Sequence, residues 1–235
     1  MNQQFGVVVV AAGKGSRMGS TESKQYLLMD HKPILVHTLE IFQAIDEVSN
    51  IVLVIGEGDE DRCKYYVEQY KLTKVSAILS GGSERQSSVL KGLRALPLET
   101  DWVLVHDGVR PFVTRQHVLA CWQQAIKEGA AVLAVPVKDT VKLVDPAGYV
   151  ESTPNRRSLW AIQTPQAFRL ADLIAAHGRA EEDEFIGTDD AMLLERLGSK
   201  VAIVEGSYGN IKITTPEDLT WAEYNIQRNK GEGQL

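Results

Sequence analysis

The sequence predicts an open α/β fold: a mostly parallel, twisted sheet with helices on both of its faces, as in Rossmann-like proteins. Short apolar runs rich in Val and Ile recur along the chain, and stretches of helical period lie between them. Runs of this kind suit strands that are buried on both faces of a parallel sheet. Strands that alternate with helices are joined by right-handed crossovers, which place the helices over the sheet.

The expected elements follow one another along a single domain that covers residues 1–235. Strands are expected at Phe5–Ala12, Ile51–Ile55, Trp102–His106, Ala130–Val135 and Val201–Glu205. Helices are expected at Pro33–Ala44, Ser87–Ala95 and Thr114–Glu128. With 235 residues and 44% hydrophobic content, the chain is long enough to bury one substantial core.

One segment departs from the alternation of strands and helices. Two extended pieces, Val141–Val144 and Tyr149–Thr153, flank the turn-forming sequence Asp145-Pro146-Ala147-Gly148. Two extended pieces joined by such a turn predict a β-hairpin. Because its sequence is polar for a core element, we expect an arm at about 138–158 that projects into solvent or meets another subunit.

Composition limits the classes of partner. Lys and Arg number 25 against 31 Asp and Glu, and the net charge of −6 argues against a general surface for nucleic acid. The first apolar run is too short to span a bilayer and is not followed by a signal cleavage site, so we expect a cytoplasmic protein without a membrane partner. Cys63 and Cys121 lack the spacing of a metal or redox pair and are expected to be buried thiols.

A glycine-rich loop follows the first expected strand, with the sequence Ala11-Ala12-Gly13-Lys14-Gly15-Ser16-Arg17-Met18-Gly19. Its glycines let the backbone approach a ligand and present amide donors to an anion. The loop fits neither the dinucleotide fingerprint nor the P-loop, because Met18 stands where each pattern needs glycine. Lys14 by itself fits a solvated surface charge better, but together with Arg17 and the nearby Lys24 it favours a triphosphate ligand.

A single carboxylate, Asp107, follows the expected strand that ends at His106. Ligands of open α/β sheets bind beyond the carboxyl ends of the strands. Mg²⁺ takes hard oxygen ligands and completes its octahedron with waters and substrate phosphates, so Asp107 is the candidate metal ligand. A helix cap is the structural alternative for Asp107, and His106 is expected to be packed without a chemical role.

Six motifs occur in order along nearly the whole chain. They are Ala11-Ala12-Gly13-x-Gly15-x-Arg17-Met18, Lys24-Gln25-Tyr26-Leu27, Gly81-Gly82-x-Glu84-Arg85, His106-Asp107-Gly108-x-Arg110-Pro111, Thr164-Pro165-Gln166-x-Phe168 and Asn210-Ile211-Lys212-x-Thr214-x-Pro216-x-Asp218-Leu219. Their order and spacing resemble the 2-C-methyl-D-erythritol 4-phosphate cytidylyltransferase family. The resemblance implies a nucleotidyltransferase fold, Mg²⁺ dependence and a homodimer formed through the arm. It also implies transfer of the cytidylyl group of CTP to a polyol phosphate in isoprenoid precursor biosynthesis.

The same resemblance assigns roles to individual residues. The catalytic residues would be Arg17, Lys24 and Lys212, with Asp107 as the magnesium ligand. CTP would be bound by Ala11, Ala12, Gly13, Gly15, Lys24, Gly82, Ser83, Ser88 and Gly108. The polyol phosphate would be bound by Arg110, Thr140, Arg156, Thr164, Thr188 and Lys212. Thr140 and Arg156 would reach across from the second subunit, and the adjacent Arg157 is an alternative to Arg156.

Two other functions are compatible with parts of the sequence. A ribitol 5-phosphate cytidylyltransferase would share the CTP loop and the aspartate, but the segments 159–164 and 187–191 resemble the erythritol family more. A catalytically silent nucleotide-binding module is the other alternative, and the presence of Arg17, Lys24 and Asp107 together argues against it. The expected reaction needs no general base, because the attacking oxygen belongs to a phosphate that is already ionised at neutral pH.

Overall fold

The computed structural model describes residues 4–13 and 22–232. Within this part of the chain, the centre is a seven-stranded sheet of order β11-β7-β10-β6-β1-β4-β5. Its strands are β1 (Phe5–Ala11), β4 (Val48–Ile55), β5 (Val75–Ser80), β6 (Trp102–Asp107), β7 (Ala130–Pro136), β10 (Trp160–Arg169) and β11 (Ala202–Glu205). Strand β10 runs antiparallel between β6 and β7, and the other neighbouring strands are parallel. The prediction of an open, mostly parallel sheet is confirmed.

The seven-stranded sheet includes two strands that the sequence pattern did not reveal. Strand β5 forms one edge of the sheet and is only partly buried, so its sequence lacks a fully apolar run. Strand β10 is buried over residues 163–168, yet it includes Gln163, Thr164 and Gln166. Polar side chains and Pro165 interrupt its hydrophobic pattern, which is why periodicity did not predict it.

The helices are α1 (Ile34–Gln43), α2 (Glu60–Gln69), α3 (Arg85–Arg94), α4 (Arg115–Glu128), α5 (Leu170–Glu182), α6 (Ala191–Arg196) and α7 (Pro216–Glu232). The predicted bounds of α1, α3 and α4 are right to within two residues. Helix α4 shows why: the hydroxyl of Thr114 accepts a hydrogen bond from the backbone of His117 at its start. Gly129 ends the same helix with φ of 92°, a conformation that favours glycine.

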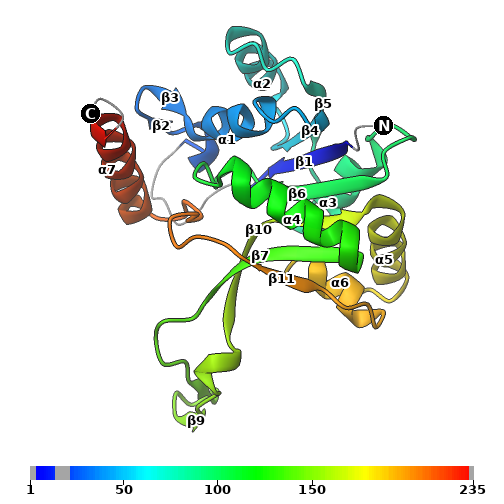
Figure 1. Ribbon diagram of the computed structural model, residues 1–235, viewed down its shortest axis with the longest axis vertical. Coiled ribbons are helices and arrows are strands. Elements are labelled where there is room, and N and C mark those ends of the chain that lie inside the picture. The colour runs from blue at the N-terminus through cyan, green and yellow to red at the C-terminus, as the bar shows by residue number, and fades with distance from the viewer. Residues whose placement is uncertain (1–3, 14–21, 233–235) are drawn as a thin grey trace.

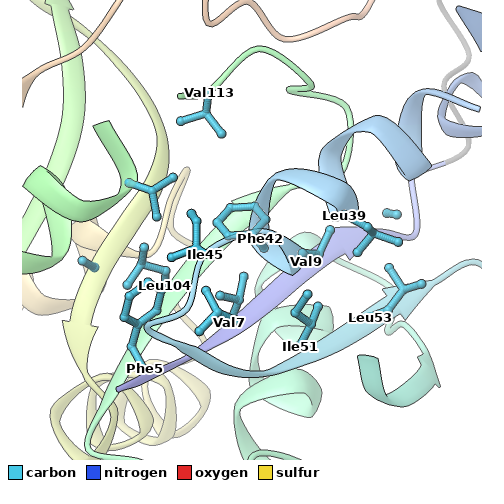
Figure 2. Close-up of a cluster of buried hydrophobic side chains, with 14 of the residues drawn as sticks. Phe5, Val7, Val9, Leu39, Phe42, Ile45, Ile51, Leu53, Leu104 and Val113 are labelled. Carbon is cyan, nitrogen blue, oxygen red and sulfur yellow. The ribbon is translucent and has the colours of Figure 1, made fainter. Parts of the chain in front are cut away.

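Both faces of the sheet are covered by helices, as predicted (Figure 1). Alternate side chains of β1 point to opposite faces: Val7 and Val9 pack with α1, α2 and α4, whereas Val8 packs with α3, α5 and α6. Figure 2 shows the first of these clusters, in which Phe42 of α1 lies close to the sheet. The main core therefore fixes β1 and β6 side by side at the centre of the molecule.

A third, smaller cluster attaches α7 to the rest of the chain. Met29 of the short strand β2 (Leu28–Met29, paired with β3, Lys32–Pro33) packs there with Ile213 and Ala222. The carboxylate of Asp218 accepts hydrogen bonds from the backbone of Thr214 and Thr215 at 2.8 and 2.9 Å. These contacts hold the α7 end of the segment between β11 and α7 that contains Lys212.

The predicted hairpin is present as β8 (Leu143–Val144) and β9 (Val150–Ser152), which pair antiparallel. Asp145 shapes the turn, because its carboxylate accepts from the backbone of Ala147 at 3.0 Å and of Tyr149 at 2.9 Å. The hairpin extends well away from the sheet (Figure 1). Its role as a contact with a second subunit stays a prediction.

Two smaller expectations concern the thiols and the membrane. Cys63 and Cys121 are both buried, as expected, and burial raises the pKa of Cys63 to about 11. Across residues 4–13 and 22–232, no helix combines enough length with enough apolar character to cross a bilayer.

We expect Phe42→Ala to lower the free energy of unfolding by about 3–5 kcal/mol, because Phe42 is fully buried and its truncation leaves a cavity. Leu98→Ala is the matched control, since Leu98 is 104% exposed and its loss should change stability by about 0.5 kcal/mol or less. Urea unfolding of both variants measures the difference. Equal, small effects would contradict the placement of Phe42 in the core.

Candidate functional site

Two cavities formed by described residues open at the carboxyl ends of β1 and β6. The first has a volume of about 240 Å³ and is lined by Val10, Ala11, Ala12, Gly13, Lys24, Gln25, Gly82, Ser83, Glu84, Arg85, Ser88, Asp107, Val109 and Lys212. The second has a volume of about 260 Å³ and is lined by Arg85, Asp107, Arg110, Ile162, Gln163, Thr164, Gln166, Thr188, Asp189 and Lys212. Both cavities share a wall made of Arg85, Asp107 and Lys212.

Asp107 is the anionic centre of this shared wall. It is the last residue of β6 and is 6% exposed. Lys212 Nζ lies 2.8 Å from Oδ2, Arg85 Nε lies 3.3 Å from Oδ1, and Arg110 Nε lies 3.7 Å from Oδ2. Burial opposes ionisation of the carboxyl, but the charges of Arg85, Lys212 and Arg110 outweigh it and hold the pKa of Asp107 well below its usual range. Asp107 is therefore ionised at neutral pH.

Asp107 does not act as a helix cap, which was the structural alternative. The next helix, α4, begins after Thr114, and the side chain of Thr114 supplies its cap. His106 has the packed position that was expected. It is fully buried, its ring contacts Phe42 at 5.0 Å between centroids, and burial lowers its pKa to about 4.

Arg85, which is part of the shared wall, connects Asp107 to a second buried carboxylate, that of Asp190. Arg85 Nη1 donates to Asp190 Oδ2 at 2.7 Å, and Asp190 is 1% exposed. Nε2 of His177 lies 3.3 Å from the other carboxylate oxygen of Asp190. Neither ring nitrogen of His177 has a hydrogen-bond partner of good geometry among the described residues. Burial would lower the pKa of Arg85, but the charges of Asp190 and Asp107 outweigh it and raise that pKa. Arg85 is thus held between two fixed anions.

The first cavity is shaped by close backbone approaches. A Cβ added to Gly81 would lie 2.6 Å from the Cβ of Ala12, so only glycine fits between the two loops. The hydroxyl of Ser88 accepts from the backbone of Gly82 at 3.0 Å. Gln25 Nε2 donates to the carbonyl of Ala11 at 2.8 Å, which ties the short 3-10 helix Lys24–Tyr26 to the end of β1. These contacts fix the positions of Lys24 and of the Gly81-Gly82 turn.

The second cavity is built around Thr164 of β10. Its hydroxyl accepts from the backbone of Asp107 at 3.1 Å and lies 3.1 Å from His106 Nδ1. Arg110 Nη1 donates to the carbonyl of Asn210 at 2.7 Å, which brings the segment before α7 against this wall. Thr188 completes the exposed side of the cavity.

The structure brings together most of the residues that the sequence singled out. Ala11, Ala12, Gly13, Lys24, Gly82, Ser83 and Ser88 line the first cavity, Arg110, Thr164 and Thr188 line the second, and Asp107 and Lys212 line both. Gly108 lies beside them: its backbone donates to the carbonyl of Val10 at 2.8 Å, and its neighbour Val109 lines the first cavity. Gly15 and Arg17 lie outside the described residues.

Thr140 and Arg156 are not part of either cavity as formed by the described residues of this chain. Both are exposed near the base of the arm, and Arg156 Nη1 donates to the carbonyl of Lys138 at 2.7 Å. Arg157 is also exposed on the arm.

Sequence reasoning missed Arg85 and Asp190 as members of the site. Each stood in a quoted segment, Gly81–Arg85 and 187–191, but neither received a role. The sequence held no distinct signal for Asp190, because an acidic residue directly before a helix is also the usual pattern of a helix cap. Its pairing with Arg85, 105 positions away, depends on the fold.

Comparison with known proteins identifies the family. The profile described as "IspD: 2-C-methyl-D-erythritol 4-phosphate cytidylyltransferase" matches residues 5–228. The protein of that description from Alkaliphilus metalliredigens is 48% identical over 228 residues, which are 96% of this chain and 95% of the relative. The one from Desulforamulus reducens is 47% identical over 222 residues, which are 94% of this chain and 95% of the relative. The chain belongs to this family.

Solved structures of the 2-C-methyl-D-erythritol 4-phosphate cytidylyltransferase family have the same fold. A 4-diphosphocytidyl-2C-methyl-D-erythritol synthase from Anaerococcus prevotii has a TM-score of 0.84 at 36% identity and covers 96% of this chain and 97% of its own. The Thermus thermophilus enzyme has a TM-score of 0.79 at 33% identity and covers 96% and 100%. The chain is therefore a nucleotidyltransferase of the cytidylyltransferase class. The ribitol 5-phosphate and silent-module alternatives are not favoured.

We expect Arg85→Met to lower the free energy of unfolding by about 3–5 kcal/mol, because it leaves the buried carboxylate of Asp190 without its cation. The double variant Arg85→Met/Asp190→Leu should regain most of that stability, since both buried charges are then removed. Arg94→Met is the control on the same helix, where an exposed pair with Glu181 is worth about 0–1 kcal/mol. A double variant no more stable than Arg85→Met would contradict the buried pair.

Proposed function

We propose that the two cavities form one active site, which transfers the cytidylyl group of CTP to 2-C-methyl-D-erythritol 4-phosphate. The products are 4-diphosphocytidyl-2-C-methyl-D-erythritol and pyrophosphate. The observation that carries this proposal is the wall of Arg85, Asp107 and Lys212 shared by the two cavities. Two anionic substrates that meet beside the cations Arg85 and Lys212 of this wall can react across it.

The first cavity is proposed to bind CTP. Ala11, Ala12 and Gly13 line it, and backbone amides in a glycine-rich turn suit a triphosphate. Gly82, Ser83 and Ser88 are assigned to the nucleoside by the family resemblance, and Ser88 is tied to the Gly82 backbone. Lys24 lines this cavity, and it is proposed to act at the α-phosphate together with Arg17.

The second cavity is proposed to bind the polyol phosphate. Arg110, Lys212 and Arg85 supply positive charge to it, and Thr164 and Thr188 supply hydroxyl groups. Lys212 has a central place because its ammonium lies on Asp107, between the two cavities. A phosphate held there would face the α-phosphate of a triphosphate in the first cavity.

The proposed reaction is an in-line displacement. An oxygen of the acceptor phosphate forms a bond to the α-phosphorus of CTP, and the bond from that phosphorus to the bridging oxygen of the β-phosphate breaks. Pyrophosphate leaves with the electron pair. Negative charge grows on the α-phosphate oxygens, where the fixed cations Lys24, Lys212 and Arg85 stabilise it.

Asp107 has the chemistry of a magnesium ligand, which is why we propose Mg²⁺ as the cofactor. It is an ionised oxygen donor that lines both cavities, and Mg²⁺ binds through one or two carboxylates together with substrate phosphates. When bound, the ion would neutralise phosphate charge and orient the triphosphate.

Release of pyrophosphate from CTP tests the proposed function directly. We expect turnover with 2-C-methyl-D-erythritol 4-phosphate and a kcat/KM lower by about 100-fold or more with ribitol 5-phosphate, since a mismatched acceptor is poorly aligned. Preference for ribitol 5-phosphate would support the alternative enzyme. Binding of CTP without release of pyrophosphate with either acceptor would support the silent module.

Asp107→Asn should lower kcat by about 100-fold or more, because it removes the charge that would hold Mg²⁺ and anchors Lys212. EDTA should abolish activity of the unaltered protein, and added Mg²⁺ should restore it. Asp101→Asn is the matched control, since Asp101 is exposed just before the opposite end of β6 and should leave kcat unchanged. Unchanged turnover in Asp107→Asn and in EDTA would remove the metal assignment.

We further propose that the protein is a homodimer, in which Thr140 and Arg156 of one subunit serve the acceptor cavity of the other. Supporting this, Leu143, Val144 and Val150 are exposed on the arm although they are apolar. A two-stranded hairpin is only marginally stable by itself in water, so packing on a partner would stabilise it.

A mixing experiment tests the shared site. Arg156→Ala and Lys24→Ala chains should each be nearly inactive alone, because each lacks one cation of every site. After subunit exchange, mixed dimers should regain activity, since one of their two sites then has both cations. Absence of recovery after exchange has been confirmed by mass spectrometry would refute the shared site and leave the proposed reaction standing.

A further inference from the structure

We propose that Asn210 is a positioning residue, which sets the catalytic Lys212 against the acceptor side of the active site. This inference rests on the proposed function. Asn210 lies in the segment between β11 and α7, two positions before Lys212, and it is 1% exposed. It lines neither cavity formed by the described residues, so any effect on the reaction must pass through its neighbours.

The side chain of Asn210 fastens its segment to β10. Its Nδ2 donates to the carbonyl of Thr164 at 2.9 Å and to Oε1 of Gln163 at 3.2 Å. Gln163 returns a hydrogen bond, because its Nε2 donates to the carbonyl of Ser207 at 2.8 Å. Two amide side chains therefore join a segment without regular secondary structure to the strand that carries Thr164.

The backbone carbonyl of Asn210 holds Arg110, another residue that lines the acceptor cavity. Its carbonyl accepts from Arg110 Nη1 at 2.7 Å, and three residues later the backbone of Ile213 donates to the carbonyl of Val109 at 2.9 Å. Lys212 lies between these two attachments, and its ammonium reaches Asp107 at 2.8 Å. Asn210 thus joins Thr164, Arg110 and Lys212, which come from three distant parts of the chain.

The chemistry of this position requires an amide donor. Both partners of Nδ2 are oxygens that only accept, and Asn210 Oδ1 has no partner among the described residues. An aspartate of the same shape would place a carboxylate against the two acceptor oxygens. Loss of a purely structural residue would lower stability and activity whether or not Lys212 is present. Loss of a positioning residue should lower activity only when Lys212 is present.

The test is a double-mutant cycle on the whole protein, with kcat/KM for the polyol phosphate as the readout. Asn210→Ala alone should lower it by about 10- to 100-fold, since a displacement of ~1 Å at a reacting group costs on that order. KM for CTP should stay nearly unchanged. In a Lys212→Ala background, the same substitution should cost only a small further factor, because its effect acts through the lysine.

Two variants accompany the cycle. Asn210→Asp keeps the side-chain shape and should reproduce the loss, which also covers the case in which Asn210→Ala folds poorly. Asn50→Ala is the matched control, because Asn50 pairs with Gly6 toward the opposite end of the sheet from the cavities and should leave kcat/KM unchanged. Thermal unfolding of every variant separates loss of fold from loss of alignment.

The outcomes are distinct. An undiminished kcat/KM in Asn210→Ala, or an equal loss with and without Lys212, would overturn the positioning role. An equal rise in KM for both substrates would do the same, because it would indicate a general structural defect. Failure of the unaltered protein to release pyrophosphate would refute the proposed function instead.

Discussion

The site depends on one buried anion, the carboxylate of Asp107, and on the cations drawn to it. Arg85 comes from the start of α3, Arg110 follows β6, and Lys212 precedes α7. Three positive groups placed this close together would repel one another in a partly desolvated site. The carboxylate of Asp107 offsets part of that repulsion, and Asp190 adds a second anion beside Arg85. In the proposed reaction, these cations are in place before the two phosphate-bearing substrates arrive, as electrostatic catalysis requires.

Strand β10 connects this centre with the arm. It runs antiparallel between β6 and β7, so Thr164 in its middle lies against the backbone of Asp107. Its first residue, Trp160, pairs with Pro136 at the end of β7, where the chain leaves for the hairpin. One strand therefore carries residues of the second cavity and begins where the arm returns to the sheet.

Much of the precision of the site comes from buried polar residues that hold neighbouring segments in place. Gln25 fastens the helix of Lys24 to the end of β1, Asp190 holds Arg85, and Asn210 holds the segment of Lys212. Burying such groups is costly unless they are hydrogen-bonded, and here each makes a specific bond to a distant segment. The loops around the cavities are thus held in place although they lack regular secondary structure.

The sequence by itself determined the fold class, five strands, the three named helices, the hairpin and the position of Asp107, because each leaves a local pattern. Val-rich runs indicate strands that are buried on two faces. Thr114 and Gly129 mark the two ends of a helix. A carboxylate directly after a strand indicates the edge of the sheet at which ligands bind. Only the tertiary structure decided that β10 is a central strand and that Arg85 joins Asp107 to Asp190. Polar residues hide such a strand from hydrophobic periodicity, and ion pairs between segments far apart in sequence exist only once the chain has folded.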